Sequence, residues 1–183
     1  MYKIDVNLAK EALLHIESGL EKYLNIISQF NQVDVSKDME FQKSFNGFYR
    51  IRQRQQKFYE EFYNFMELNK NKDITFEETL KHLYLKINRV ERSFSSKLVA
   101  TINPNKPVWD QYVMKNLNIK IPSYSSKDRL DKTIKAYNSL EKWYEEYLNS
   151  YDSNSVLNLF NEKYPDVEIT DVKKIDLILW QMR

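Results

Sequence analysis

The 183-residue sequence contains no cysteine and only two glycines, Gly19 and Gly47. The absence of cysteine excludes disulfide bonds, thiolate zinc sites, iron–sulfur clusters and a cysteine nucleophile. Nucleotide-binding loops of the Rossmann and P-loop types need closely spaced glycines, so both types are excluded as well. A chain with so few glycines has few residues suited to tight left-handed turns, which favours helices over a β-sandwich.

Histidine is also scarce, since His15 and His82 are the only two. Each falls within a plain helical pattern, and neither lies near a nucleophile motif. No pair of histidines and carboxylates has metal-ligand spacing of the HExxH kind. We therefore expect no metal ion, no cofactor and no histidine-based catalysis.

Long apolar runs are missing too, because no stretch reaches the roughly 18 apolar residues that a membrane-spanning helix needs. The N-terminal segment Met1–Leu20 carries acidic residues and lacks a small-residue cleavage site, unlike a secretory signal. We expect a cytoplasmic protein with no membrane partner. The 28 basic and 26 acidic residues give a net charge of +2, so any nucleic-acid footprint must come from local clustering.

Apolar residues recur at three- and four-residue spacing along most of the chain, and no segment alternates like a strand. The pattern predicts an all-α protein, a single domain over residues 1–183, with an N-terminal helical pair over 1–70 and a helical core over 75–183. About eight helices are expected. They cover Val6–Phe30, Phe41–Leu68, Thr75–Ile87, Val90–Ile102, Asp110–Leu117, Ser125 or Ser126 to Leu148, Val156–Tyr164 and Thr170–Met182. Thr75 with Glu78 has the spacing of a capping box, and Thr170 is expected to cap the last helix. In that helix Asp176 borders the apolar face, so it is expected to need a partner.

The longest predicted helix, Phe41–Leu68, carries two polar features. Gln55 falls inside its apolar stripe, and a buried glutamine must find hydrogen-bond partners, so we expect Gln55 at a packed junction or facing a cleft. Arg50, Arg54 and Lys57 would share one flank of this helix. Such a row is typical of a solvated flank, and it also suits contact with phosphate groups.

The segment Ser95–Leu117 contains the closest succession of helix-ending and helix-starting signals in the chain. A helix is predicted to end at Asn103-Pro104, because proline cannot donate a hydrogen bond and the residue before it avoids the α region. After a second proline, Asp110 opens a short helix, where its carboxylate can accept first-turn N–H groups. Trp109 and Met114 have the spacing of a hydrophobic staple around this start.

This order of helix, tight break, helix, proline-containing loop and helix-opening aspartate resembles the helix-hairpin-helix DNA glycosylase superfamily. The family's hairpin, of hydrophobic-x-Gly-hydrophobic-Gly type, is similar to Ile87-Asn88-Arg89-Val90-Glu91 in its apolar positions. The family's Pro-Val-Asp segment is similar to Pro107–Val113, in which one residue, Trp109, separates the valine from Asp110. Ser93 stands where lyase members carry a lysine.

The resemblance implies a two-lobed helical fold that binds duplex DNA and flips a nucleotide out of the stack. Asp110 would be the catalytic residue of a monofunctional glycosylase. Gln55, Trp109 or Tyr112 would contact the base. The phosphate contacts would be Arg50, Arg54, Lys57, Arg92, Lys97 and Lys115.

Three departures from the family bear on activity. Arg89 and Glu91 replace the hairpin glycines, which bring backbone N–H groups close to phosphate, and Ser93 replaces the lyase lysine. Lyase chemistry at that position is therefore not expected, and a relative with altered or lost base excision is among the expectations. The alternative is a non-catalytic helical interaction protein in which Asp110 only caps a helix. The sequence does not specify the base, the pathway or the oligomeric state.

Overall fold

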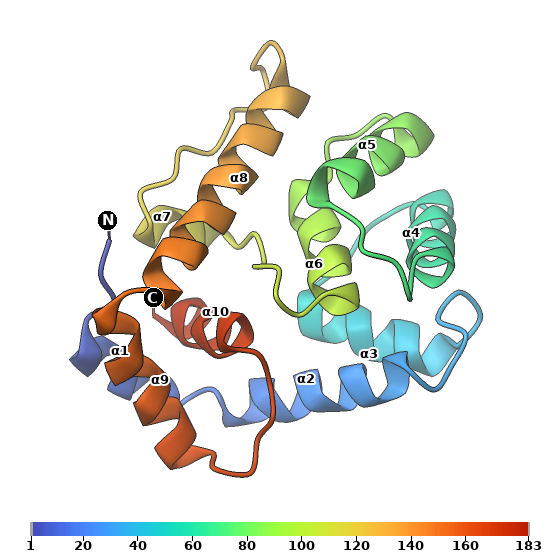
Figure 1. Cartoon of the computed structure of the whole chain (residues 1–183). Helices are drawn as coiled ribbons and strands as arrows, with labels where there is room; N and C mark the ends of the chain where they lie inside the picture. The colour runs from blue at the N-terminus through green and yellow to red at the C-terminus, as the bar shows by residue number, and fades with distance from the viewer. Residues whose placement is uncertain (1, 183) are drawn as a thin grey trace. The chain divides into compact units, whose positions relative to one another are not determined.

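The structure, a computed structural model, describes residues 2–182 as helices joined by short loops (Figure 1). This part of the chain contains ten helices and no strand, so the all-α prediction is confirmed. None of these helices combines the length and the apolarity needed to cross a membrane. Their bounds are α1 Val6–Leu13, α2 Glu17–Phe30, α3 Met39–Tyr49, α4 Gln56–Leu68, α5 Phe76–Ile87, α6 Arg92–Ile102, α7 Gln111–Asn116, α8 Arg129–Leu148, α9 Tyr151–Lys163 and α10 Asp171–Gln181.

The prediction of one continuous helix over Val6–Phe30 is wrong, because the chain turns between α1 and α2. Leu14 ends α1, and the N–H of His15 bonds to the carbonyl of Ala12 in the turn. Ile16 within this turn is 1% exposed, so the apolar periodicity continues across the break without requiring a helix there. The apolar spacing at Ile16 therefore reflects the burial of this side chain and does not indicate a continuous helix.

The predicted helix Phe41–Leu68 is also divided, into α3 and α4. Arg50 ends α3 in the left-handed conformation with φ 54°, and Gln53 has φ 55°. The break lets α4 fold back on α3, where the Tyr63 hydroxyl donates to Asn46 Oδ1 at 2.9 Å. The expected row of Arg50, Arg54 and Lys57 along one helical flank is therefore wrong.

Two further boundaries differ from the prediction. Helix α8 begins at Arg129 rather than at Ser125 or Ser126, because Asp128 before it adopts φ 56° and interrupts helical geometry. Helix α9 begins at Tyr151 rather than at Val156. Ser153 is fully buried in the first turn of α9, and its hydroxyl donates to the carbonyls of Leu148 and Ser150. These hydrogen bonds allow a polar residue to be buried in the helix.

The chain forms two compact units that alternate along the sequence. Unit 1 combines the N-terminal residues up to Glu17 with the residues from Pro104 onward, and unit 2 is Ser18–Asn103. This division differs from the grouping into residues 1–70 and 75–183 that the sequence suggested. The single domain over 1–183 stays a prediction.

Unit 1 is organised around α10, which packs against α1, α7, α8 and α9. Its side chains Ile175, Ile178 and Leu179 have no exposed surface, and Thr170 caps its start by accepting the N–H of Lys173, as predicted. Aromatic residues of α8 add to the same core, where Trp143 stacks on Tyr147 with the two rings 9° from parallel. The last helix of the chain is therefore the centre of its unit.

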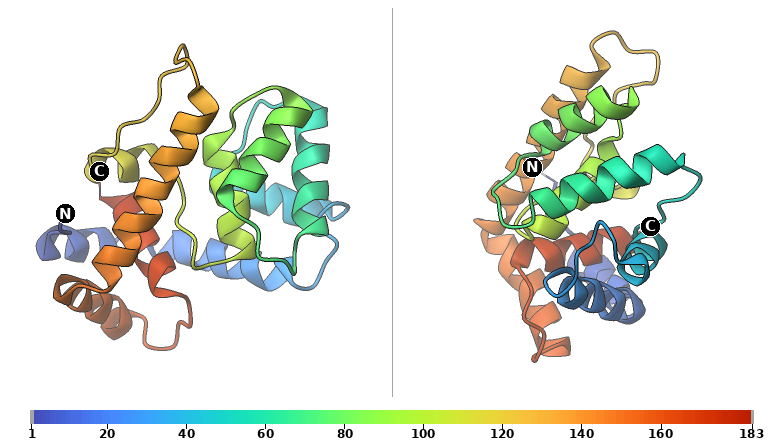
Figure 2. Two further views of the ribbon diagram at one scale, coloured as in Figure 1. Left: turned by 45° about the horizontal axis from the view of Figure 1, so that its top comes forward. Right: turned by 90° about the vertical axis from the view of Figure 1, so that its right-hand side faces the viewer.

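Unit 2 has a core rich in phenylalanine. Phe45 and Phe62 face each other from α3 and α4 with ring centroids 5.8 Å apart, and Phe58 lies 5.5 Å from Phe94 of α6. Helix α5 packs against both α4 and α6, and the two views of Figure 2 show α5 and α6 side by side. The predicted capping box of Thr75 and Glu78 at the start of α5 is present, with both reciprocal hydrogen bonds formed.

Candidate functional site

Asp110 lies at the N-cap of α7, half-buried, in extended backbone conformation. Its carboxylate oxygen Oδ1 accepts the N–H of Tyr112 at 2.8 Å, and its carbonyl accepts the N–H of Met114 at 2.9 Å. Trp109 is 2% exposed and Met114 is fully buried, the arrangement expected of a hydrophobic staple. The local geometry of Asp110 is thus that of a helix cap in unit 1.

The two aromatic residues predicted to contact a base lie in different surroundings. A side chain as buried as Trp109 belongs to the core of unit 1 and offers no open face for stacking. Tyr112 is 36% exposed on α7. Among the six predicted phosphate contacts, only Lys115 belongs to the same unit as Asp110.

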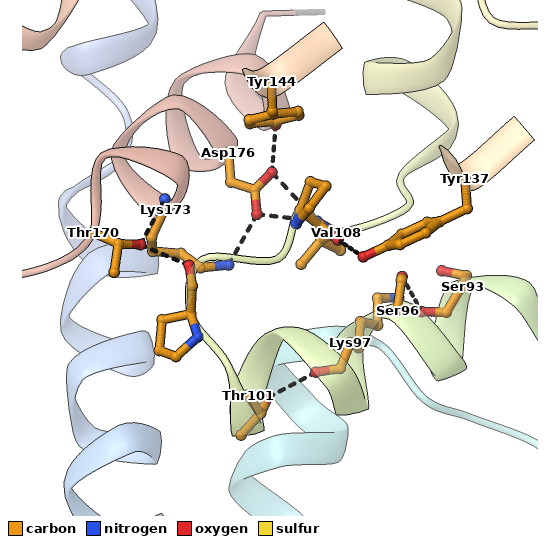
Figure 3. A network of polar contacts seen from close by, with 12 residues as sticks. Ser93, Ser96, Lys97, Thr101, Val108, Tyr137, Tyr144, Thr170, Lys173 and Asp176 are labelled. Atoms are coloured by element: carbon orange, nitrogen blue, oxygen red, sulfur yellow. Dashed lines mark hydrogen bonds and ion pairs between the residues drawn. The ribbon is translucent and has the colours of Figure 1, made fainter. Parts of the chain in front are cut away.

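A buried polar network holds the loop that leads to Asp110 (Figure 3). Asp176 of α10, which borders an apolar face in the sequence, is 6% exposed and accepts three hydrogen bonds. The donors are the Tyr144 hydroxyl, the Lys173 ammonium at 3.0 Å and the Val108 backbone N–H at 3.1 Å. Tyr137 fixes the same loop by donating to the carbonyl of Pro107 at 2.8 Å.

The protonation of this network follows from burial. Burial raises the pKa of Asp176, while Lys173, Tyr144 and the N–H of Val108 act in the opposite direction. Burial, followed by the negative charge of Asp176, raises the pKa of Tyr144 well above its ordinary value of 10, so this phenol stays protonated and donates. Because three donors surround the Asp176 carboxylate, the network acts as an anchor for the loop rather than as a proton-transfer site.

The turn between α5 and α6 is the segment that resembles a helix-hairpin-helix. Asn88 ends α5 in the left-handed conformation, with φ 53°. Glu91 precedes α6 with φ −91°, a conformation open to any residue. The tight turn is therefore made by an asparagine, which tolerates positive φ better than most residues, without the glycines of the family's motif.

A cleft of about 390 Å³ lies between this turn and the start of α4. Four cationic side chains and one carboxylate line it, together with Gln55, Phe58, Ile87 and Asn88; the charged residues are Arg54, Lys57, Lys86, Arg89 and Glu91. Gln55 precedes α4 without making a side-chain cap hydrogen bond, unlike Asp38, Thr75 and Thr170 at other helix starts. The start of α4, where a helix carries partial positive charge, therefore belongs to the lining of a cleft that is already cationic.

The remaining predicted phosphate contacts lie away from this cleft's lining. Arg50 ends α3 on the surface, and Arg92 lies in the first turn of α6. Lys97 donates to the carbonyl of Tyr49 at 3.0 Å, and its ammonium lies 5.3 Å from the Phe94 ring centroid, so it supports the core of unit 2. Lys115 is exposed in the last turn of α7.

The structure thus brings together three of the residues singled out from sequence, Gln55, Arg54 and Lys57, with Lys86 and Arg89, which were not chosen as phosphate contacts. Both missed cations flank the predicted α5–α6 turn. Their proximity to Lys57 of α4, and to Arg54 in the loop before α4, depends on the packing of α4 against α5, which spacing along the chain does not reveal.

Comparison of the chain with protein-family models, with curated proteins and with solved structures finds no match in any of the three. A function for this chain must therefore be argued from the chemistry of its own sites.

Proposed function

We propose that this chain binds the phosphate backbone of nucleic acid, duplex DNA in first place, at the cleft of unit 2. The observation that carries the proposal is the convergence of four cationic side chains on one concave site: Arg54, Lys57, Lys86 and Arg89. Basic residues gathered in this way are the electrostatic footprint of a phosphate-binding surface, even in a chain whose net charge is only +2. The start of α4, which has no side-chain cap, adds the partial positive charge of a helix N-terminus to the same lining.

The resemblance to helix-hairpin-helix glycosylases supports the same place on the chain. In that family the hairpin contacts DNA phosphate, and here the corresponding turn supplies Arg89 and, just before it, Lys86. The side chains replace the close backbone approach that the hairpin glycines would allow. Base excision is not part of the proposal, because Asp110 has the geometry of a helix cap.

A helical interaction protein, the alternative, would need a contiguous apolar surface. In unit 2 the large exposed apolar side chains belong to four different helices and are Leu24, Met39, Leu68 and Leu85. Single exposed apolar residues are normal on protein surfaces. The charged cleft is therefore the stronger basis for a function.

Removing two cations from the rim of the cleft is expected to weaken DNA binding. Lys57→Gln with Lys86→Gln removes exposed charges without touching the core. Affinity for a short labelled duplex should fall, and the slope of log affinity against log salt should become shallower by about one per lost phosphate contact. Fluorescence anisotropy at low and moderate salt measures both quantities.

The matched control is Lys22→Gln with Lys43→Gln, which makes the same change in net charge at exposed positions of unit 2 outside the cleft. This control should bind like the parent. If the parent does not bind duplex DNA at low salt, or if both double variants lose affinity equally, the cleft is not the binding site.

For Asp110, we expect a structural effect without a catalytic one. Asp110→Ala should lower the free energy of unfolding by about 1 kcal/mol through loss of the cap, whereas Asp110→Asn, which retains a capping side chain, should cost less. Both variants should match the parent in a base-release assay on duplexes with damaged bases. Release by the parent that disappears in Asp110→Asn would instead assign Asp110 a catalytic role.

A further inference from the structure

The cleft of unit 2 contains an acidic residue that already holds two of its arginines. Glu91 Oε1 lies 3.3 Å from Arg54 Nε and 3.3 Å from Arg89 Nε. The side chain of Glu91 is 8% exposed, that of Arg54 is 23% exposed and that of Arg89 is 60% exposed. One buried carboxylate thus bridges two guanidinium groups that come from different parts of unit 2.

This bridge brings opposite charges close together, but its hydrogen-bond donors and acceptors are poorly matched. Arg54 Nε and Glu91 Oε1 are both buried, yet neither has a hydrogen-bond partner. The remaining contact, from Arg54 Nη2 to Glu91 Oε2, is 3.5 Å long, at the outer limit of a hydrogen bond. Arg54 Nη1 donates to the carbonyls of Arg52 and Gln53 at 3.4 Å, so Nε and Nη2 form the edge that faces Glu91. A guanidinium can donate in parallel to two oxygens of a well-placed anion, and here both contacts of this edge are long.

We propose that the cleft is a receptor for a terminal phosphate monoester of nucleic acid, and that Glu91 occupies the position of this phosphate until the ligand displaces it. This inference rests on the proposed function. A phosphodiester and the Glu91 carboxylate each carry one negative charge, so their exchange gains little. A phosphate monoester carries about −1.5 to −2 charges at pH 7 and three strong acceptor oxygens, so it gains both charge and directed hydrogen bonds on Arg54 and Arg89.

The arrangement of the cations also favours a chain end over continuous backbone. The lining cations converge on one cleft of about 390 Å³. Lys57 and Lys86 at its exposed rim exceed what a single phosphate needs, and they can take the phosphodiesters that follow the terminal group in a nucleic acid. A free nucleotide or a phosphorylated peptide would bring no second phosphate to these rim cations. Lys86 Nζ has only a long ion pair with Glu61 Oε2, at 3.9 Å, so it stays able to contact a phosphodiester.

The test compares two duplexes that are identical except for a 5′-phosphate or a 5′-hydroxyl, both labelled at the 3′ end. The parent should bind the 5′-phosphorylated duplex about tenfold more tightly, as expected for charge-assisted hydrogen bonds to one added anion. Glu91→Gln frees both arginines, so it should bind the 5′-hydroxyl duplex more tightly than the parent does, and its preference for the phosphate should shrink. Lys43→Gln, outside the cleft, should keep the preference of the parent.

Arg89→Gln provides a second test, because Arg89 is largely exposed and its replacement leaves the core intact even if Glu91→Gln does not fold. It should reduce the preference for the 5′-phosphate. Equal binding of both duplexes by the parent would overturn the inference and leave the proposed DNA binding standing. Binding of neither duplex would overturn both.

Competition distinguishes the sources of the phosphate. A deoxynucleoside 5′-monophosphate and a phosphoserine peptide should compete poorly with the phosphorylated duplex. If either one displaces the duplex at a concentration near the dissociation constant of the duplex itself, the assignment to nucleic-acid ends is overturned.

Discussion

Replacing Asp176 by leucine should lower the free energy of unfolding by about 3–5 kcal/mol, because it leaves the buried ammonium of Lys173 without its counter-charge. The side chain of Lys173 is 4% exposed, so water cannot compensate. The same substitution removes the acceptor for the Tyr144 hydroxyl and the Val108 N–H. Chemical denaturation followed by circular dichroism measures the loss.

A double variant separates the buried charge from the rest of the network. Lys173→Met with Asp176→Leu removes both charges and should recover much of the lost stability, since apolar replacements of buried ion pairs are often tolerated. Asp171→Asn, in the same helix, removes the charge of an aspartate that is 53% exposed and pairs with Lys174, and it should change stability by less than about 1 kcal/mol. A double variant as unstable as Asp176→Leu would show that the lost hydrogen bonds, rather than the unpaired charge, dominate.

Trp109→Ala is expected to cost about 3–5 kcal/mol of unfolding free energy, because it deletes a large side chain that is 2% exposed. Trp109→Phe, which keeps a ring in the same space, should cost clearly less. This outcome would identify Trp109 as part of the core that positions Asp110, rather than as a surface for a flipped base. Thermal and denaturant melts of the two variants provide the measurement.

Tyr112→Ala is the matched control, since Tyr112 is a neighbouring aromatic residue with 36% of its surface exposed. It should have a small effect on stability. If Trp109→Ala folds with near-parental stability and loses DNA affinity, then the prediction from sequence that Trp109 contacts a base is the better one.

Much of the fold could be predicted because apolar spacing and capping residues are local signals. The capping box of Thr75 and Glu78 and the cap Thr170 predicted two helix starts, and both are confirmed. The turn at Ile16 was not predicted, because a buried residue in a turn continues the apolar periodicity. The turn at Arg50 was not predicted either, because an arginine does not indicate left-handed conformation as a glycine does. The energetic cost of that conformation is offset by tertiary packing, which involves residues far apart in the sequence.

The candidate site was predictable in part. Arg54, Lys57 and Gln55 could be singled out because charge and amide groups stood near an apolar stripe. Their common cleft with Lys86, Arg89 and Glu91 could not, because it depends on the packing of α4 against α5. The need of Asp176 for a partner was visible in its position on an apolar face, whereas the identity of Tyr144 and Val108 as its donors required the fold.

The alternation of the two units along the chain has a consequence for biosynthesis. Ser18–Asn103 leaves the ribosome as an uninterrupted stretch, so unit 2 has all of its own contacts available while unit 1 is still incomplete. Helix α1 is made before unit 2, but α9 and α10, against which it packs, are made after it. The side chains Ala9 and Leu13 of α1, which are buried in the folded protein, therefore lack α9 and α10 as packing partners while the whole of unit 2 is synthesised. During that interval they form an apolar segment suited to capture by a chaperone.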